Sequence, residues 1–343
     1  MKRRVVLILP LALIAICSAS AGAEPDSGYA VRQRVVVGGD GGWDYLVVDA
    51  EARRLYVTRG SHVQIFDADS LKPVGDIPDT AGVHGVALAP NLGRGFTSNG
   101  RANSITIFDL KTLKTIEEVR IPGQNPDAIL YDPASKRVFA FDGGSADATV
   151  LDAGDGKVIG TIPIGGKPEF ATSDGAGRLY VNIEDKSELV AIDSAKSAVS
   201  GRWPLAPCEE PSGMAIDRAH NRLFVGCSNR LMAVVDAPSG RVVATVPIGA
   251  GVDANGFDPG TGLAFSANGE GSLTVAREES PGKYAAASVP TQRGARTMAL
   301  DEKTHRIFLV TADYGPPPSP TADQPRARPP VLPGTFTILV VSR

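Results

Sequence analysis

The residues best suited to bind a ligand recur at a regular spacing along this chain. They are four acids, a histidine, a serine and an arginine, separated by steps of 40–43 positions: Asp44, His84, Asp127, Glu169, Ser212, Asp253 and Arg296. Carboxylates with a single imidazole suit a hard or borderline cation, such as calcium or zinc. The regular spacing indicates that a repeated structural unit places these side chains at equivalent points.

Six of these residues form the candidate ligand-binding set: Asp44, His84, Asp127, Glu169, Asp253 and Arg296. A small polar ligand, a divalent cation such as calcium, or Arg296 itself would balance the carboxylates. The alternative is a ring of solvated side chains without a ligand, since open water screens each pair at ~4 Å to about 1 kcal/mol or less. No local spacing of metal ligands is present, so the metal and the cofactor stay undetermined.

A repeat of about 42 residues supplies the elements that position this ring. Each candidate residue stands five positions before a first anchor, which is aspartate in six of seven units: Asp49, Ala89, Asp132, Asp174, Asp217, Asp258 and Asp301. A basic–apolar–aromatic–apolar stretch follows, as in Arg54-Leu55-Tyr56-Val57, and then a second aspartate. Four short strand signals per unit predict an all-β, seven-bladed propeller with four-stranded blades. The first strand of each blade should line the central channel, with the ring at its mouth.

The seventh unit lacks a fourth strand. It shows strand signals at 295–300, 305–311 and 335–341, and then the chain ends. Residues 32–39 resemble the fourth-strand sequence 241–247 of another unit. We therefore predict that the N-terminal strand completes the last blade and removes an open sheet edge.

Two irregular features map to the face that carries the ring. Cys208 and Cys227 fall in one unit, with Cys227 expected to face about Ser212, and an exported protein favours a disulfide between them over two free thiols. Residues 314–334 form a proline-rich insertion in the last blade, either a loose surface loop or a lid over the channel mouth.

Residues 1–23 have the pattern of a signal peptide cleaved after Ala23. Lipidation at Cys17 is the alternative, and Ile16 before it disfavours that interpretation.

The mature chain, 24–343, is expected to form a single domain. We expect it to be monomeric, to lack a transmembrane segment, and to lie in the periplasm or outside the cell. Its 32 basic and 38 acidic residues, a net charge of −6, argue against a strongly basic surface for nucleic acid.

Three stretches resemble the repeats of bacterial YVTN-type propellers: Leu55-Tyr56-Val57-Thr58, Leu179-Tyr180-Val181-Asn182 and Leu223-Phe224-Val225-Gly226. Over residues 30–343 the chain resembles the YncE-like family of exported seven-bladed propellers. This resemblance implies a periplasmic or surface protein, and DNA is a possible partner by resemblance alone.

Catalytic motifs such as a Walker A loop, H-E-x-x-H and G-x-S-x-G are absent from the sequence. The hypothesis is a non-catalytic binding or scaffold propeller, with a protein or small ligand at the channel mouth. The alternative is an enzyme that uses the channel carboxylates, either a metal-dependent hydrolase of the lactonase type or a quinone-dependent dehydrogenase-like protein.

Overall fold

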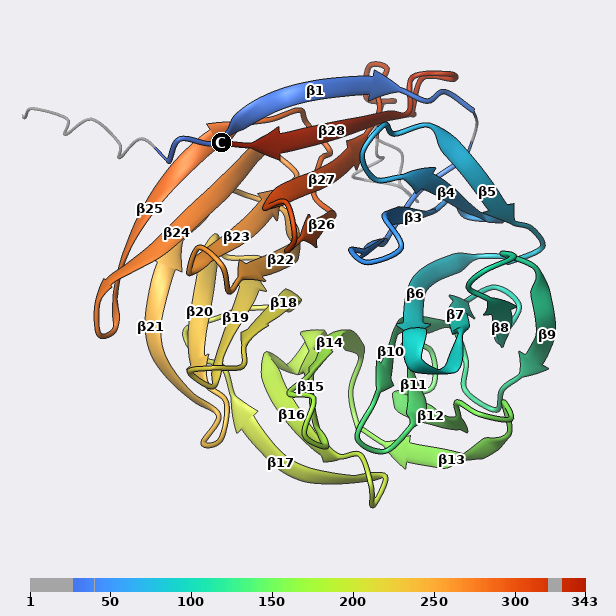
Figure 1. The fold of residues 1–343 in the computed structure, drawn as a ribbon. Coiled ribbons are helices and arrows are strands. Elements are labelled where there is room, and N and C mark those ends of the chain that lie inside the picture. The colour runs from blue at the N-terminus through green and yellow to red at the C-terminus, as the bar shows by residue number, and fades with distance from the viewer. Residues whose placement is uncertain (1–26, 40, 320–328) are drawn as a thin grey trace, which may run out of the picture.

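The computed structural model describes residues 27–39, 41–319 and 329–343. Seven four-stranded antiparallel sheets stand around a central axis, which confirms the predicted all-β propeller (Figure 1). The predicted signal peptide, 1–23, lies outside the described residues. Among the described residues, no helix is both long enough and apolar enough to span a bilayer.

The first three blades follow one another along the chain. Blade 1 consists of β2 (Leu46–Asp49), β3 (Arg54–Thr58), β4 (Val63–Asp67) and β5 (Pro73–Ile77). Blade 2 consists of β6 (Val83–Ala89), the short 3-10 helix η1 (Pro90–Leu92), β7 (Arg94–Asn99), β8 (Ser104–Asp109) and β9 (Thr115–Arg120). Blade 3 consists of β10 (Pro126–Asp132), β11 (Arg137–Asp142), β12 (Asp147–Asp152) and β13 (Val158–Pro163).

The remaining blades continue in the same sense. Blade 4 consists of β14 (Pro168–Ser173), β15 (Arg178–Ile183), the 3-10 helix η2 (Glu184–Lys186), β16 (Glu188–Asp193) and β17 (Ala198–Pro204). Blade 5 consists of β18 (Pro211–Asp217), β19 (Arg222–Cys227), β20 (Leu231–Asp236) and β21 (Arg241–Pro247). Blade 6 consists of β22 (Val252–Asp258), β23 (Leu263–Asn268), β24 (Ser272–Ser280) and β25 (Lys283–Pro290). Blade 7 consists of β26 (Met298–Asp301), β27 (Arg306–Thr311), β28 (Thr337–Ser342) and the N-terminal β1 (Ala30–Val36).

The repeated aspartates begin the turns between strands. Asp109 Oδ1, for example, accepts hydrogen bonds from the backbone N–H of Thr112 at 2.7 Å and from its hydroxyl at 2.8 Å. Such turns satisfy backbone donors where the strand ladder stops. Ala89, the one anchor that is not aspartate, is followed instead by η1.

Several first anchors also connect neighbouring blades. Asp301 of blade 7 lies 2.8 Å from the Arg53 guanidinium of blade 1. Asp258 of blade 6 lies 2.8 Å from His305 Nδ1 of blade 7. Both carboxylates are fully buried. These polar contacts therefore connect the turns of adjacent blades, whereas apolar side chains connect the faces of their sheets.

The N-terminal strand closes the ring as predicted. β1 pairs with β28 in an antiparallel ladder that runs from Ala30 opposite Ser342 to Val36 opposite Thr337. Figure 1 shows β1, in blue, along β28, in dark red, at the outer edge of the last blade. Beyond the strand, Val37 N–H still donates to Phe336 O at 2.8 Å.

Candidate functional site

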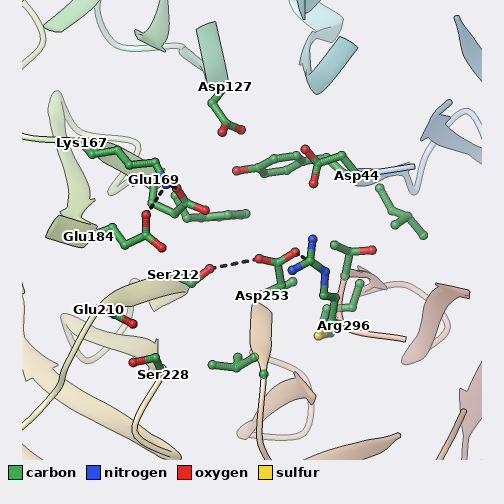
Figure 2. A pocket seen from close by; sticks show the side chains of 18 residues that line it. Asp44, Asp127, Lys167, Glu169, Glu184, Glu210, Ser212, Ser228, Asp253 and Arg296 are labelled. Atoms are coloured by element: carbon green, nitrogen blue, oxygen red, sulfur yellow. Dashed lines mark hydrogen bonds and ion pairs between the residues drawn. The ribbon is translucent and has the colours of Figure 1, made fainter. Parts of the chain in front are cut away.

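The predicted ring residues lie at or just before the first residues of the innermost strands. Five of the six candidate residues line a cavity of about 370 Å³ at the channel mouth, named here the acid cavity: Asp44, Asp127, Glu169, Asp253 and Arg296. His84 is outside this lining and contacts Asp44 from the adjoining side. Figure 2 shows the side chains converging from different blades on a common space.

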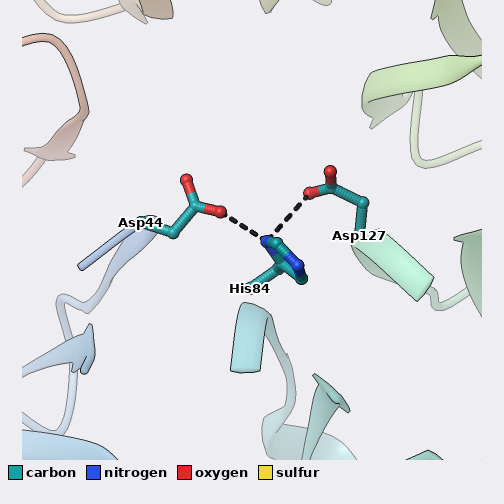
Figure 3. Close-up of side chains that lie close together, drawn as sticks. All are labelled: Asp44, His84 and Asp127. Carbon is teal, nitrogen blue, oxygen red and sulfur yellow. Dashed lines mark hydrogen bonds and ion pairs between the residues drawn. The ribbon is translucent and has the colours of Figure 1, made fainter. Parts of the chain in front are cut away.

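Three of the residues form one compact group, shown in Figure 3. His84 Nδ1 lies 2.6 Å from Asp44 Oδ2 and 3.7 Å from Asp127 Oδ1. One ligand atom from each residue lies within 4.8 Å of the others. Burial by itself would lower the pKa of His84, but the hydrogen bond with Asp44 and the charge of Asp127 outweigh it and raise that pKa.

Glu169 belongs to a second group on blade 4. Its Oε2 lies 3.3 Å from Lys167 Nζ, and Lys167 also pairs with Glu184. Burial, with the charges of Asp127 and Glu184, raises the pKa of Glu169 to about 8 against the opposing effect of Lys167. Glu169 therefore carries a proton at neutral pH.

Asp253 forms the third group with residues of blades 5 and 7. Ser212 Oγ donates to Asp253 Oδ1 at 3.2 Å, and Arg296 Nε lies 3.2 Å from Asp253 Oδ2. Burial still raises the pKa of Asp253 although Arg296 opposes the shift. Arg296 thus acts as the counter-charge that the sequence suggested, for one carboxylate of the ring.

Three carboxyl groups of the ring are less exposed to solvent than the sequence led us to expect. The side chains of Asp127, Glu169 and Asp253 are only 17–18% exposed. Burial, helped by the negative charges of Asp44 and Asp253, raises the pKa of Asp127 to about 6 even though His84 opposes the shift. From the sequence we expected open water to screen the repulsion between these carboxylates. That expectation is wrong for Asp127, Glu169 and Asp253, because the surrounding blades exclude much of the solvent.

An aromatic pair forms part of the cavity wall. Tyr45 stacks on Phe170 with ring centroids 5.5 Å apart and an interplanar angle of 19°. Tyr45 comes from blade 1 and Phe170 from blade 4, so the contact crosses the channel. Burial and the surrounding acids raise the pKa of Tyr45 well above its usual value, so its hydroxyl stays neutral and can serve as a donor.

Three charged residues of the cavity were not expected from the sequence: Lys167, Glu184 and Glu210. Lys167 stands two positions before Glu169, and Glu184 follows the second strand of the same blade. Loops after second strands emerge on the same face as loops before first strands. Reading the position just after each second strand would have identified Glu184 and also Ser228.

The disulfide lies beside this cavity. Cys208 and Cys227 are bonded, with Cα atoms 5.4 Å apart, as predicted. Cys227 faces Pro211, one position from the expected Ser212, because the β18–β19 register shifts between Pro211 and Met214. The bonded loop carries Glu210, whose N–H donates to Ser187 Oγ at 3.0 Å.

The described ends of the proline-rich insertion pair with each other near the mouth. Tyr314 forms a bridge with Val331, and Gly315 N–H donates to Pro330 O at 2.8 Å. Tyr314, Pro329 and Val331 line a second cavity, which adjoins the first. These ends therefore lie at the channel mouth.

Comparisons with known proteins support the fold. No protein-family model matches the sequence, and no curated protein sequence matches it. Among solved structures, the chain is similar to hydrazine synthase of Kuenenia stuttgartiensis, with a TM-score of 0.68, 15% identity, and 80% of this chain and 94% of that chain covered.

Two further structures are similar at 8% identity, both with a TM-score of 0.72. They are U3-55K, covering 92% of this chain and 99% of that one, and the WD40 repeats of RRP9, covering 93% and 99%. At this level of identity the likeness concerns the architecture alone. The chain is a seven-bladed β-propeller.

Proposed function

We propose that this protein is a non-catalytic binding propeller that takes a cationic small molecule in the acid cavity. The observation that carries the proposal is the composition of the cavity wall. Six acidic residues face two basic ones there: Asp44, Asp127, Glu169, Glu184, Glu210 and Asp253 against Lys167 and Arg296. A positively charged group inside would relieve the repulsion among those acids that are ionised.

The size of the cavity favours a molecule over a bare ion. Its volume of about 370 Å³ lies within the range of roughly 300–1,000 Å³ typical of small-molecule sites. The stacked Tyr45 and Phe170 add an apolar wall. Aromatic rings beside carboxylates suit an organic cation, which needs both charge compensation and an apolar contact.

The test compares a cation with a neutral molecule of the same shape. Calorimetry should show that propylammonium binds the purified protein at pH 7.5 and that propanol does not. Asp253→Asn should weaken propylammonium binding about tenfold. Asp155→Asn is the matched control, because Asp155 is a half-exposed acid in a hairpin turn that pairs with Lys157. Equal affinity for propylammonium and propanol, or an equal effect of the two variants, would overturn the proposal.

A metal-dependent hydrolase is the second candidate, and the group of Asp44, His84 and Asp127 favours it. Two carboxylates and an imidazole within 4.8 Å fit a borderline ion such as Zn²⁺ better than Ca²⁺, which takes six to eight oxygen ligands. In that role His84 Nδ1 would lose its proton and coordinate the ion, and bound metal would activate water.

Metal analysis of the purified protein tests this candidate. One equivalent of metal that is lost in His84→Ala would favour the hydrolase over the binding propeller. Metal content below a tenth of an equivalent after incubation with Zn²⁺, Mn²⁺ and Ca²⁺ would exclude it.

Export to the periplasm or cell surface, with cleavage after Ala23, and kinship with YncE-like propellers belong to the same proposal. The disulfide between Cys208 and Cys227 supports an oxidising compartment. N-terminal sequencing of the protein recovered from the periplasm would test the cleavage site.

A further inference from the structure

A second cavity, of about 420 Å³, adjoins the acid cavity and shares Gly251, Arg296 and Thr297 with it. Its wall has the opposite character, and we name it the arginine cavity. No acidic side chain lines it among the described residues. Its wall is formed by two guanidinium groups, two aromatic rings and the end of the proline-rich insertion: Arg293, Arg296, Trp43, Tyr314, Pro329 and Val331.

Both arginines have guanidinium N–H groups that can donate hydrogen bonds to a ligand. Arg293 is exposed and lies 6.0 Å over the ring of Tyr314. In the described part of the chain its guanidinium has no ion pair and no hydrogen bond. Arg296 Nε lies 3.2 Å from Asp253 Oδ2, and its two terminal nitrogens donate no hydrogen bond to those same residues. A guanidinium group is a permanent cation in proteins, and it binds a carboxylate through two parallel hydrogen bonds.

The aromatic residues of the arginine cavity are fixed by packing. Trp43 lies against Phe336, with ring centroids 5.3 Å apart. Tyr314 lies directly over the backbone of Gly294, where an added Cβ would come within 2.2 Å of the tyrosine hydroxyl. Gly294 has φ +83, a backbone conformation that favours glycine. The cavity therefore has apolar sides beside its two cations.

We propose that the ligand is a short zwitterionic peptide that spans both cavities. Its N-terminal ammonium lies in the acid cavity, its C-terminal carboxylate binds Arg293 and Arg296, and an apolar side chain packs against Trp43 and Tyr314. Arg296 lines both cavities and contacts Asp253 on the side of the acid cavity. The acidic wall and the basic wall therefore meet at this residue, and a ligand with an ammonium and a carboxylate could reach both. The ammonium half of this proposal rests on the proposed function, whereas the carboxylate half rests on the arginine cavity alone.

The dipeptide alanylphenylalanine is the probe, and calorimetry on the purified protein is the measurement. The dipeptide should bind, and its C-terminal amide should bind about tenfold more weakly because a charge-assisted contact is lost. Arg293→Gln should weaken the dipeptide to a similar extent and have no effect on the amide. Arg241→Gln, on the exposed outer strand β21, is the matched control and should change neither affinity.

The outcomes separate this proposal from the proposed function. If the amide binds as well as the dipeptide, or Arg293→Gln behaves like Arg241→Gln, the zwitterionic ligand is excluded while cation binding stands. If N-acetyl-alanylphenylalanine binds as well as the dipeptide, the acid cavity does not receive the peptide ammonium and the zwitterionic ligand is excluded, while propylammonium binding still decides the proposed function. Absence of dipeptide binding at millimolar concentration excludes the peptide, and propylammonium then decides the proposed function by itself.

Discussion

Three acids of the channel mouth, Asp127, Glu169 and Asp253, have raised pKa values. Burial and mutual repulsion raise the pKa of Asp127 to about 6 and that of Glu169 to about 8, and they also raise that of Asp253. Each group therefore gains a proton more readily than a carboxyl in water. The charge of the acid cavity thus changes over the physiological pH range, and binding of a cation must compete with protons.

Cation affinity should accordingly rise with pH. At pH 5 Asp127 and Glu169 are both protonated, whereas by pH 8 Asp127 is ionised and Glu169 about half ionised. Propylammonium keeps its charge over this range because its amine resembles that of lysine. We expect its affinity to rise about tenfold or more from pH 5 to pH 8, as measured by calorimetry, with Glu169→Gln removing the part of the rise above pH 7. An affinity independent of pH would contradict this electrostatic account.

A further acid with a raised pKa lies outside the site. Asp142, at the end of β11, is fully buried, and its Oδ1 has no hydrogen-bond partner. Burial and the charge of Asp147 raise its pKa to about 7, although Thr149 donates to its Oδ2 at 2.7 Å. Blades 2 and 6 carry Asn99 and Asn268 at the equivalent position, where the amide donates to hydroxyl groups of the neighbouring strand.

Asp142→Asn should therefore stabilise the protein at alkaline pH. The folded-state pKa lies above the unfolded value of about 3.8, so ionisation costs stability that is intact below pH 4 and lost as the pH rises to 7. We expect the variant to exceed the wild type in free energy of unfolding by roughly 2–4 kcal/mol at pH 8 and by little at pH 4. Urea titrations at both pH values measure this difference, and a difference independent of pH would refute the explanation.

At the level of elements, the disulfide holds the loop before β18 against the end of β19. The loop contributes Glu210 to the acid cavity, and Ser228, just after β19, lines it as well. Ser228 N–H donates to Glu209 O at 2.9 Å, which joins the two segments beyond the sulfur atoms. The disulfide therefore stabilises one wall of the cavity in addition to the blade.

Replacing both cysteines by serine should destabilise the protein by about 3 kcal/mol. The bond closes a loop with a sequence separation of 19, and the entropy of an unlinked loop of this length corresponds to that free energy. Denaturant unfolding of the variant and the oxidised wild type gives the difference. Thiol titration of the unreduced, denatured wild type is the control and should find no free thiol; two free thiols would show that the bond does not form.

At the level of the molecule, the N-terminal strand determines whether the ring is closed. β1 supplies the fourth strand of blade 7 and covers the edge of β28. Without it, β28 would present unpaired backbone groups, and the apolar cluster between blades 7 and 1, which includes Phe308, Phe336 and the partly buried Val35, would be exposed.

Deleting residues 24–38 should therefore abolish cooperative unfolding or cause aggregation. Deleting 24–26 alone, which leaves β1 intact, is the control and should leave the melting temperature unchanged. Calorimetric scans and light scattering compare the two truncations. A protein without 24–38 that melts like the full mature chain would show that the ring does not depend on this strand.

The fold could be predicted because its determinants are local and repeated. Each anchor aspartate begins a turn through its own neighbours, as Asp109 does with Thr112, and the same pattern recurs around the ring. The missing fourth strand of the last unit indicated how the ring closes. Observed boundaries differ by a few residues: β1 ends at Val36, before Gly38 and Gly39 with φ +76 and +77.

The sequence by itself determined the blade number, the strand that closes the ring, the cysteine pair and the level of the ring residues, because periodicity requires only spacing along the chain. Only the tertiary structure decided which ring residues touch: His84 with Asp44, and Asp253 with Arg296. It also decided the pKa shifts and the two adjoining cavities. These depend on solvent exclusion and on distances between residues that are 40 or more positions apart in the sequence, and no local pattern encodes either.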